Sequence, residues 1–484
     1  MKAKINILFL LLGISICLSC GVKRVVVAPP AAQEVSSLLV NEVSLKTIPQ
    51  EKVIDFQLLF KNVLENKLND LSYPEVIRNF YLNKGFQPVL VPKFLPDSAL
   101  AVMVAYLDSA AAHGLVPKLF FVEDVKEGMK ELSRKKSAVN KYKDTVELEL
   151  TIANALLKYS NTLQFGLVDP SKVDSNYFSE TGKADSISML RVLEVQNLKS
   201  YLDSIQPKDV QYVALQTALK NEVQVPGKSR DETDQTIKVN LERLRWKNKP
   251  LEEKYVLINI ADYSLDVMDK GKSILNMKVC VGEADKQTPQ LNSRIYSVQV
   301  NPIWNIPASI ARNEISKYAT NDRYYLENNN IIVYKQDKRV YNTESIDWST
   351  VDVGSYSFKQ RPGQQNSLGK IKFLFKNESS VYLHDTPVKS AFKKKIRAVS
   401  HGCVRVEKPL ELALALFNKG PKYDQIKSGM QSGYPRAKYI GLPEQVPISI
   451  TYYTARTTAK GGILFSPDIY GLDEVLYTAM SAQL

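Results

Sequence analysis

The chain has 484 residues, of which 44% are hydrophobic and 24% are charged. This composition is typical of globular domains and excludes both a disordered chain and a membrane protein with many spans, and the length predicts roughly two to four domains. The net charge is +13, but the basic residues are scattered and form no zinc-finger or recognition-helix pattern, so nucleic acid is not an expected partner.

The first 20 residues have the pattern of an export signal. Two lysines precede an apolar run from Ile5 to about Ile16, and small residues and Cys20 follow it. Cys20 has the position of a lipidated cysteine, although Cys17 stands where such sites usually carry leucine. An uncleaved anchor is the alternative, but the run is shorter than the roughly 20 apolar residues of a spanning helix. We therefore expect a periplasmic protein of a Gram-negative-type bacterium, tethered to the inner or outer membrane.

Two further segments precede the C-terminal half. Residues 21–50 are rich in Val, Ala, Pro, Gln and Ser without periodicity, which predicts a flexible tether. In residues 51–250 the apolar positions recur at helical spacing, as in VELELTIANALLKYSNTL, and Gly and Pro fall between the periodic segments. The pattern predicts a mainly helical domain with a few short strands. His113 has no carboxylate or thiol at a workable offset, so we expect a helix-end residue favoured by the helix dipole, without chemistry.

Residues 251–484 have the pattern of a mainly β domain. YVLINIADYSLDVMD and SILNMKVCVG flank a Lys-Gly-Lys turn, which is a hairpin signature, and later segments continue it. One clear helix is expected to begin at Pro409 and to stop at Gly420. Residues 312–360 are polar and poorly periodic, and such a long excursion predicts a cap or lid over a site. The fold class is therefore α+β multidomain: a helical N-terminal scaffold followed by a mainly β domain with an inserted cap.

Two cysteines follow the leader. Cys280 lies in an apolar run and is expected to be a small buried hydrophobic residue, whereas Cys403 lies among polar and basic residues. An exported protein usually pairs its cysteines, so a Cys280–Cys403 disulfide is one alternative. An unpaired Cys403 thiol would call for a function.

The stretch Ser400-His401-Gly402-Cys403 allows three interpretations. It is half of a metal site if His384 joins His401 and Cys403, although structural zinc sites use CxxC-like pairs. It is a buried turn if Ser400 and His401 bond backbone groups. It is a nucleophilic site if a base activates the Cys403 thiol.

The nucleophilic interpretation has its partners nearby. His384 serves as the base if the segment VYLHD forms a strand beside Cys403, and Asp385 offers a backbone carbonyl or a carboxylate to hold its tautomer. Backbone N–H groups at His401 to Cys403 would bind an oxyanion, and Gly402 lets the backbone approach closely. Arg405 shares a face with Cys403 if the segment is extended, where it would bind a substrate carboxylate.

His384, fifteen intervening residues and then SHGCVR resemble the signature of the L,D-transpeptidases with a YkuD-type catalytic domain. The likeness extends in order through VLINIADYSLDVMD, NPIWNIPASIARNEI, RPGQQNSLGKIKFLF and VYLHDTP. ISITYYTA, FYLNKGFQPVLV and NLERLRW resemble the long, scaffold-bearing branch of the family. The resemblance covers roughly residues 70 to 475.

The resemblance implies a reaction on peptidoglycan stem peptides. Cys403 would attack the carbonyl of the third-position diamino acid of a tetrapeptide stem and release D-alanine. The thioester would then pass to an amine of a second stem, which gives a 3→3 cross-link, and carbapenems would acylate the same thiol. No metal or organic cofactor is implied. The implied roles are base for His384, orientation of that base for the backbone carbonyl of Asp385, oxyanion site for His401 and Gly402, and substrate contact for Arg405, Tyr382 and Ser400.

The chain departs from many long-branch members because no peptidoglycan-binding module with an FQxxHGL-type repeat precedes NLERLRW. Polymer docking would then rest on the scaffold, the cap or the tether. A basic run, Lys389 to Arg397, flanks the site and is either a solvated face or an attractor of stem carboxylates. Three alternatives remain: an L,D-carboxypeptidase, an enzyme that anchors a lipoprotein to the wall, and an inactive wall-binding lipoprotein.

Overall fold

The structure is a computed structural model that describes residues 55–484 apart from 247–249, 251 and 459–460. The predicted export signal, Cys20 and the tether lie outside the described residues. Among the described residues, none of the helices is both long and apolar enough to cross a membrane.

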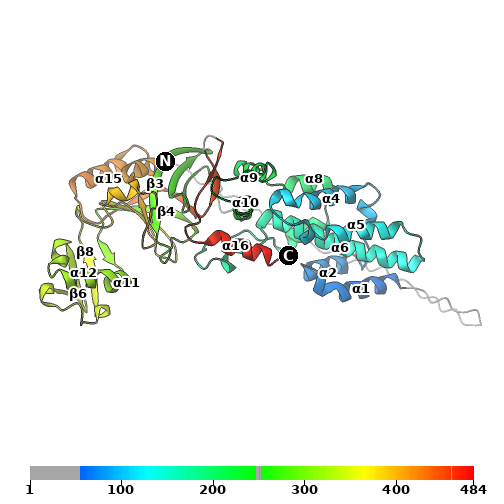
Figure 1. The fold of residues 1–484 in the computed structure, drawn as a ribbon, viewed down its shortest axis with the longest axis horizontal. Helices are drawn as coiled ribbons and strands as arrows, with labels where there is room; N and C mark the ends of the chain where they lie inside the picture. The colour runs from blue at the N-terminus through cyan, green and yellow to red at the C-terminus, as the bar shows by residue number, and fades with distance from the viewer. Residues whose placement is uncertain (1–54, 247–249, 251, 459–460) are drawn as a thin grey trace, which may run out of the picture. The chain divides into compact units, whose positions relative to one another are not determined.

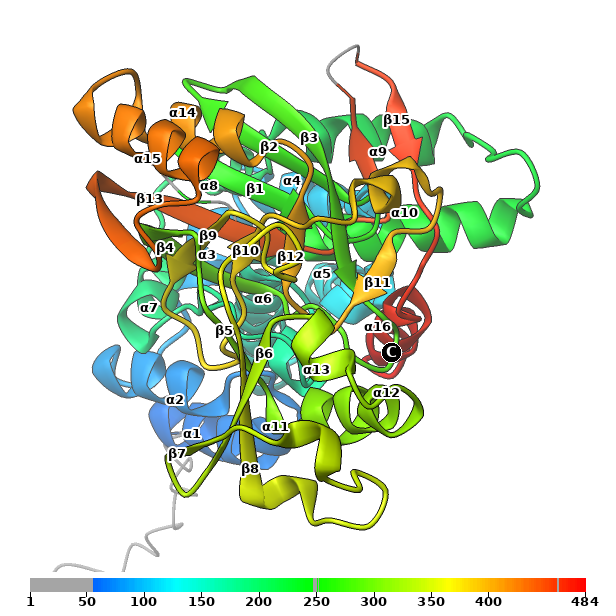
Figure 2. The ribbon, with the colours of Figure 1, turned by 90° about the vertical axis from the view of Figure 1, so that its left-hand side faces the viewer.

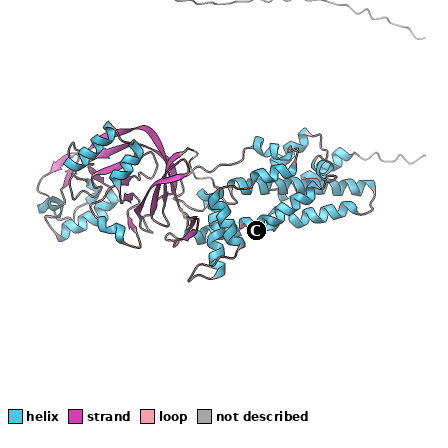
Figure 3. Cartoon of the chain, turned by 90° about the horizontal axis from the view of Figure 1, so that it is seen from above, coloured by secondary structure: helices cyan, strands magenta, loops and turns pink. Residues whose placement is uncertain are grey.

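The first part of the described chain is helical (Figures 1 and 3). Its strands were expected to be few and short, and before residue 254 the described residues contain only one isolated β-bridge, from Tyr177 to Gln290. The helices are α1 (Phe56–Lys67), α2 (Pro74–Asn83), α3 (Leu90–Phe94), α4 (Ala99–Asp108), α5 (Val122–Ser133), α6 (Ala138–Phe165), α7 (Ser186–Leu193), α8 (Leu198–Ile205), α9 (Val210–Lys220) and α10 (Arg230–Arg245).

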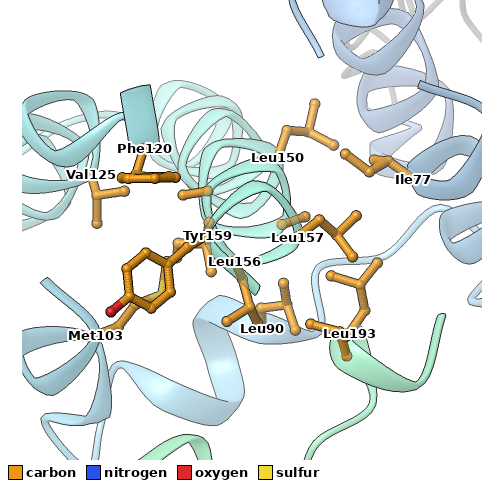
Figure 4. Packing of buried hydrophobic residues seen from close by; sticks show 14 of the residues in the cluster. Ile77, Leu90, Met103, Phe120, Val125, Leu150, Leu156, Leu157, Tyr159 and Leu193 are labelled. Atoms are coloured by element: carbon orange, nitrogen blue, oxygen red, sulfur yellow. The ribbon is translucent and has the colours of Figure 1, made fainter. Parts of the chain in front are cut away.

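Helix α6 is the centre of this helical part. It begins at Ser137, whose side chain accepts from the backbone N–H of Asn140. It ends at Gly166, which has a φ of +93°, a conformation that residues with a side chain rarely adopt. Its second half is buried almost all round, as Figure 4 shows for Leu156, Leu157 and Tyr159 among side chains of the neighbouring helices. Each such side chain contributes roughly 1.5–3 kcal/mol through burial.

The prediction that His113 is a helix-end residue favoured by the dipole is half right. His113 ends a 3-10 turn, Ser109–His113, but its side chain is buried and its Nδ1 lies 3.1 Å from the Tyr212 hydroxyl. Burial and the neighbouring Arg245 lower its pKa to about 4. The imidazole is therefore neutral, and a dipole has no charge to stabilise.

The second part is built on a nine-stranded sheet in the order β11-β3-β12-β10-β9-β4-β13-β1-β2. Because β2 also pairs with β3, the sheet closes on itself, and its apolar residues form one core with α14 and α15. Its strands are β1 (Lys254–Asn259), β2 (Ser264–Asp269), β3 (Lys272–Gly282), β4 (Leu291–Val300), β9 (Ile371–Phe375), β10 (Leu383–His384), β11 (Ala398–Ser400), β12 (Val404–Val406) and β13 (Lys438–Thr451).

More helices interrupt this part than the single one expected. The expected helix, α14 (Pro409–Phe417), starts at Pro409 but ends before Gly420 because Asn418 has a φ of +58°. Helix α15 (Pro421–Ser432) follows at once, and α16 (Leu472–Ser481) comes after the hairpin of β14 (Ala455–Thr457) and β15 (Ile463–Phe465). The weak apolar pattern of α15 explains why periodicity did not reveal it, whereas α16 has apolar residues at helical spacing, at Leu472, Leu476 and Met480, and was overlooked.

The polar excursion expected at residues 312–360 is a folded insertion between β4 and β9, which we call the cap, residues 304–360 (Figure 2). Its sheet has the order β5-β8-β6-β7, and Trp348, Phe358 and Val333 belong to a core of its own. Its elements are β5 (Trp304–Ile306), α11 (Ala308–Ile310), a π-helical turn (Ala311–Ile315), α12 (Ser316–Asn321), α13 (Tyr325–Asn328), β6 (Ile331–Lys335), β7 (Lys338–Val340) and β8 (Tyr356–Gln360).

Candidate active site

A cavity of about 250 Å³ lies between the cap and the closed sheet. The cap side is formed largely by apolar and aromatic residues, including Trp304, Ile310 and Tyr318. The sheet side brings together six residues that the sequence singled out, namely Tyr382, His384, Ser400, His401, Cys403 and Arg405.

Strand pairing explains how residues far apart in the sequence meet here. Strand β10 runs parallel to β12, with His384 opposite Arg405, and Cys403 immediately precedes β12. The Val404 N–H donates to the Tyr382 carbonyl at 3.1 Å, and this bond places Cys403 next to the residues at the start of β10. The segment VYLHD therefore lies beside Cys403, as a base–nucleophile pair requires.

His384 is held in one tautomer. Its Nδ1 lies 2.6 Å from the backbone carbonyl of Asp385, so Nδ1 carries the proton and Nε2 is left as the acceptor. Burial, followed by the charge of Arg405, lowers its pKa to about 4. At neutral pH the imidazole is thus uncharged and able to accept a proton.

The Asp385 carboxylate is turned to other partners. Its oxygens accept from the backbone N–H of Lys370 at 2.9 Å and of Thr386 at 2.7 Å, and from the Lys389 ammonium at 2.5 Å. Of the two ways in which Asp385 was expected to orient the base, the structure contains the backbone carbonyl. The carboxylate anchors the backbone that presents this carbonyl.

Cys403 is a free thiol at the cavity wall. Neither Cys280 nor Cys403 is in a disulfide, so the Cys280–Cys403 pairing does not form. Burial raises the pKa of the Cys403 thiol, and hydrogen bonds from Tyr382 and the charges of Lys372 and Arg405 oppose that rise. The thiol therefore needs a base, and His384 lies in the same cavity.

The SHGC stretch is also a turn. The Ser400 hydroxyl donates to the Cys403 carbonyl at 2.6 Å and accepts from the Gly402 N–H at 3.2 Å. Gly402 has a φ of +104°, a conformation that favours glycine. The turn and the thiol interpretations thus describe one structure, in which the turn presents the thiol.

His401 points toward the cap. Its Nε2 contacts the carboxylate of Glu314 in the π-helical turn, and that carboxylate also lies 3.9 Å from the Lys286 ammonium. No group of three or more His, Cys, Asp or Glu residues suited to a metal ion occurs in the described part of the chain. His401 therefore joins the sheet to the cap in this structure.

The basic run beside the site divides into two groups. Lys389 pairs with Asp385, and the Arg397 guanidinium donates to backbone carbonyls of β3 and of the β1–β2 turn, including Val279 and Tyr263. The remaining lysines, 393 to 395, are exposed. Two of these cations thus have structural partners.

Sequence reasoning missed three residues at this site. Lys372 on β9 interacts electrostatically with Cys403, Glu314 contacts His401, and Trp304 lies at the cavity wall next to Tyr382. For Lys372 the sequence did contain a signal, because it is a lysine in the middle of the apolar strand KIKFLF, where a charged residue is unusual and needs a partner. Glu314 and Trp304 carried no local signal, because only the folded cap brings them to the motif.

Comparison with known proteins assigns both parts of the chain. Residues 253–420 match the L,D-transpeptidase catalytic domain, YkuD, and residues 75–219 match the Scaffold domain. A curated protein of Haemophilus influenzae named "Putative L,D-transpeptidase" is 29% identical over 291 residues, which are 60% of this chain and 58% of that protein. The match thus covers less than two thirds of that relative's length.

Several solved structures were also matched, including two from mycobacteria. One is an L,D-transpeptidase from Mycobacterium smegmatis, with 14% identity, a TM-score of 0.19, and coverage of 41% of this chain and 58% of that one. The other is L,D-transpeptidase 1 of Mycobacterium tuberculosis, with 12% identity, a TM-score of 0.15, and coverage of 41% and 61%. The family models carry the assignment: the chain contains a YkuD-type L,D-transpeptidase catalytic domain at residues 253–420, preceded by a Scaffold domain at residues 75–219.

Proposed function

We propose that the protein is a peptidoglycan L,D-transpeptidase whose nucleophile is Cys403. The observation that carries this proposal is the cavity in which a free thiol, a neutral and oriented imidazole and the Arg405 guanidinium meet. A wall-binding module without catalysis has no use for that combination.

The proposed reaction begins with proton transfer from the Cys403 thiol to Nε2 of His384. The thiolate attacks the carbonyl of the third residue of a tetrapeptide stem, and N–H groups of the SHGC turn stabilise the oxyanion. The C–N bond to D-alanine breaks as the imidazolium returns the proton to the leaving amine. A side-chain amine of a second stem then attacks the thioester, gives its proton to His384 and releases Cys403, which leaves a 3→3 cross-link.

Arg405 is the proposed anchor for a stem carboxylate. It lies at the cavity wall, and no carboxylate of the described residues lies within ion-pair distance of its guanidinium. An arginine without an anionic partner in a cavity is suited to an anionic ligand. Tyr382 and the aromatic residues of the cap would contact the apolar parts of the stem.

The thiol is tested by intact-mass detection of a carbapenem adduct on the purified full chain. The wild type should gain one adduct, Cys403→Ala should gain none, and Cys280→Ala should react as the wild type does. Cys280 is the matched control because it is the other free cysteine of the described residues and is fully buried. A wild type that forms no adduct would remove the basis of the proposal.

The acceptor is tested by mass spectrometry of muropeptides from cells with and without Cys403→Ala. Loss of 3→3 dimers supports transpeptidation. Unchanged dimers with a shifted tetrapeptide-to-tripeptide ratio would show that water is the acceptor, and loss of wall-linked lipoprotein would show a protein amine. We also propose a periplasmic, membrane-tethered protein with a lipidated Cys20, for which labelling with a fatty-acid analogue, abolished by Cys20→Ala, is the test.

A further inference from the structure

Lys372 lies in one row with the catalytic base. Strand β9 is antiparallel to β10 and places Lys372 opposite His384, and β10 is parallel to β12 and places His384 opposite Arg405. Residues that are directly opposite on neighbouring strands point to the same face of a sheet. The three side chains therefore form a row in which two cations bracket the imidazole.

The Lys372 ammonium is directed toward the thiol side of this row. It lies 5.3 Å from the centroid of the Tyr382 ring, which in turn lies 5.8 Å from the ring of His384. Tyr382 also interacts with Cys403 and lowers the pKa of its thiol. Lys372 thus packs on the side chain that links the base and the nucleophile.

The charge of Lys372 has no anionic partner among the described residues, where no carboxylate lies within ion-pair distance of its ammonium. On its other side the row continues with Gln299, an uncharged amide. Burial lowers the pKa of Lys372, and its interaction with Cys403 opposes that effect. A half-buried cation without a counter-ion is costly, so a nearby group that becomes an anion stabilises it and is stabilised by it.

We propose that Lys372 is a positioning residue of the acyl-transfer site, which stabilises the Cys403 thiolate and adds to burial and Arg405 in keeping His384 neutral. This inference rests on the proposed thiol chemistry and adds to it a second cation that the SHGCVR motif does not contain. It assigns Lys372 no contact with substrate.

A nearby cation and burial shift the pKa values of a thiol and an imidazole in different ways. A cation lowers the pKa of both groups, because it favours a thiolate and disfavours an imidazolium. Burial raises the pKa of the thiol and lowers that of the imidazole. Loss of the Lys372 charge should therefore raise both pKa values, whereas loosened packing would move them in opposite directions.

Other charged or titratable residues also lie around Cys403, and the experiment leaves all of them unchanged. The titratable or charged residues around the thiol, besides Lys372 on β9, are Tyr382 and His384 at β10, Arg405 on β12, His401 in the turn, and Glu314, Tyr318 and Tyr325 of the cap. None of them is changed in the variants below.

The experiment uses the full chain with Lys372→Met, Lys372→Arg and, as the matched control, Lys376→Met. Lys376 directly follows β9 and is exposed, so its replacement removes the same charge away from the row. Iodoacetamide labelling of the Cys403 peptide is followed by mass spectrometry from pH 6 to pH 11. Carbon-13 labelling of the histidine rings gives the pKa of His384 by NMR.

Lys372→Met should raise the midpoint of Cys403 labelling by about one pH unit. Its labelling rate below that midpoint should fall only about threefold, because a thiolate of higher pKa is a better nucleophile. The pKa of His384 should rise in the same variant, whereas Lys372→Arg and Lys376→Met should match the wild type in both measurements.

The inference is overturned if Lys372→Met leaves the Cys403 midpoint unchanged, if the two pKa values move in opposite directions, or if Lys376→Met gives the same shift. Lys372→Gln supplies the same comparison if the methionine variant does not fold. Labelling needs no acyl donor, so its result stands apart from the proposed function: the shift supports the inference even in a chain that forms no cross-links.

Discussion

Asp385 performs two roles with two different groups. Its backbone carbonyl accepts the Nδ1 proton of His384, and its carboxylate accepts from backbone N–H groups on both sides and from Lys389. A buried carboxylate that is paired and hydrogen-bonded in this way is a rigid support. The tautomer of His384 therefore depends on contacts that never touch the imidazole.

Gly369 packs so closely against the Asp385 carboxylate that no side chain fits between them. A Cβ built at Gly369 would lie 2.4 Å from the Asp385 carboxylate, and its φ of +60° already disfavours a side chain. Gly369→Ala should displace Asp385 and slow carbapenem acylation of Cys403 by about tenfold to a hundredfold, because a shift of about 1 Å at a catalytic group has effects of this size. Stopped-flow acylation kinetics, with thermal unfolding to verify the fold, measure this.

Gly363→Ala is the matched control, since a Cβ at Gly363 would meet nothing within 4 Å. It should acylate at the wild-type rate. A Gly369→Ala variant that also reacts at the wild-type rate would show that the function of His384 does not depend on the position of the Asp385 carboxylate.

At the scale of elements, the cap is a separate folded piece that touches the motif. It has its own core around Trp348 and Phe358 and is joined to the closed sheet through the chain ends at β5 and β8. The contact between Glu314 and His401 connects the π-helical turn of the cap to the turn that presents the thiol. Both side chains are about one-third exposed, so this contact contributes little free energy.

Removal of this link should loosen the cap without unfolding it. Glu314→Ala should speed hydrogen exchange of backbone amides in residues 308–321 by about twofold to fivefold, which corresponds to the small free energy of an exposed pair. Hydrogen exchange followed by mass spectrometry measures this. Glu327→Ala, at an exposed position of the same cap, should leave these amides unchanged, and equal exchange in both variants would contradict a role of Glu314 in closure.

At the scale of the whole molecule, helix α10 contributes to two parts of the fold. Its Asn240 side chain bonds to Thr454 near the end of the sheet, and its Arg243 pairs with Asp473 of α16. Another residue of α10, Arg245, is fully buried and donates to the backbone carbonyl of His113. The buried histidine is thus part of the network that fixes this helix.

That network makes stability depend on pH. The pKa of His113 is about 4 in the folded chain and about 6.5 when unfolded, so the unfolded chain binds more protons between these values. The stabilisation is complete above about pH 6.5 and is lost as the pH falls through about 4, with roughly 2 kcal/mol lost from pH 7 to pH 5. The His113→Gln variant should lose less free energy of unfolding than the wild type between pH 7 and pH 5, as measured by urea unfolding.

Tyr212→Phe separates this titration from the contact itself. It removes the hydroxyl next to His113 but keeps the imidazole, so it should be destabilised at both pH values and keep the wild-type pH dependence. If His113→Gln loses as much stability as the wild type between pH 7 and pH 5, His113 is not the titrating group.

Local patterns in the sequence predicted most of the elements and singled out Cys403 and His384. Helical spacing predicted the N-terminal helices, alternation predicted the strands from β1 onward, and the SHGCVR motif with His384 predicted a thiol site, because each of these signals is written within a short stretch of chain. The same logic failed for the inner structure of the cap, whose elements are too short to show a period, and for α15, whose apolar pattern is weak.

The tertiary structure decided which side chains surround the thiol and in what state they lie. The order β12-β10-β9 brings Lys372 and Arg405 to either side of His384, and the fold of the cap brings Glu314 to His401. The sequence named Asp385 but left open whether its carbonyl or its carboxylate holds the imidazole, and the contacts of the carboxylate decide for the carbonyl. Strand order and burial are set by packing between distant segments, so the charges around Cys403 and the neutral state of His384 follow only from the folded chain.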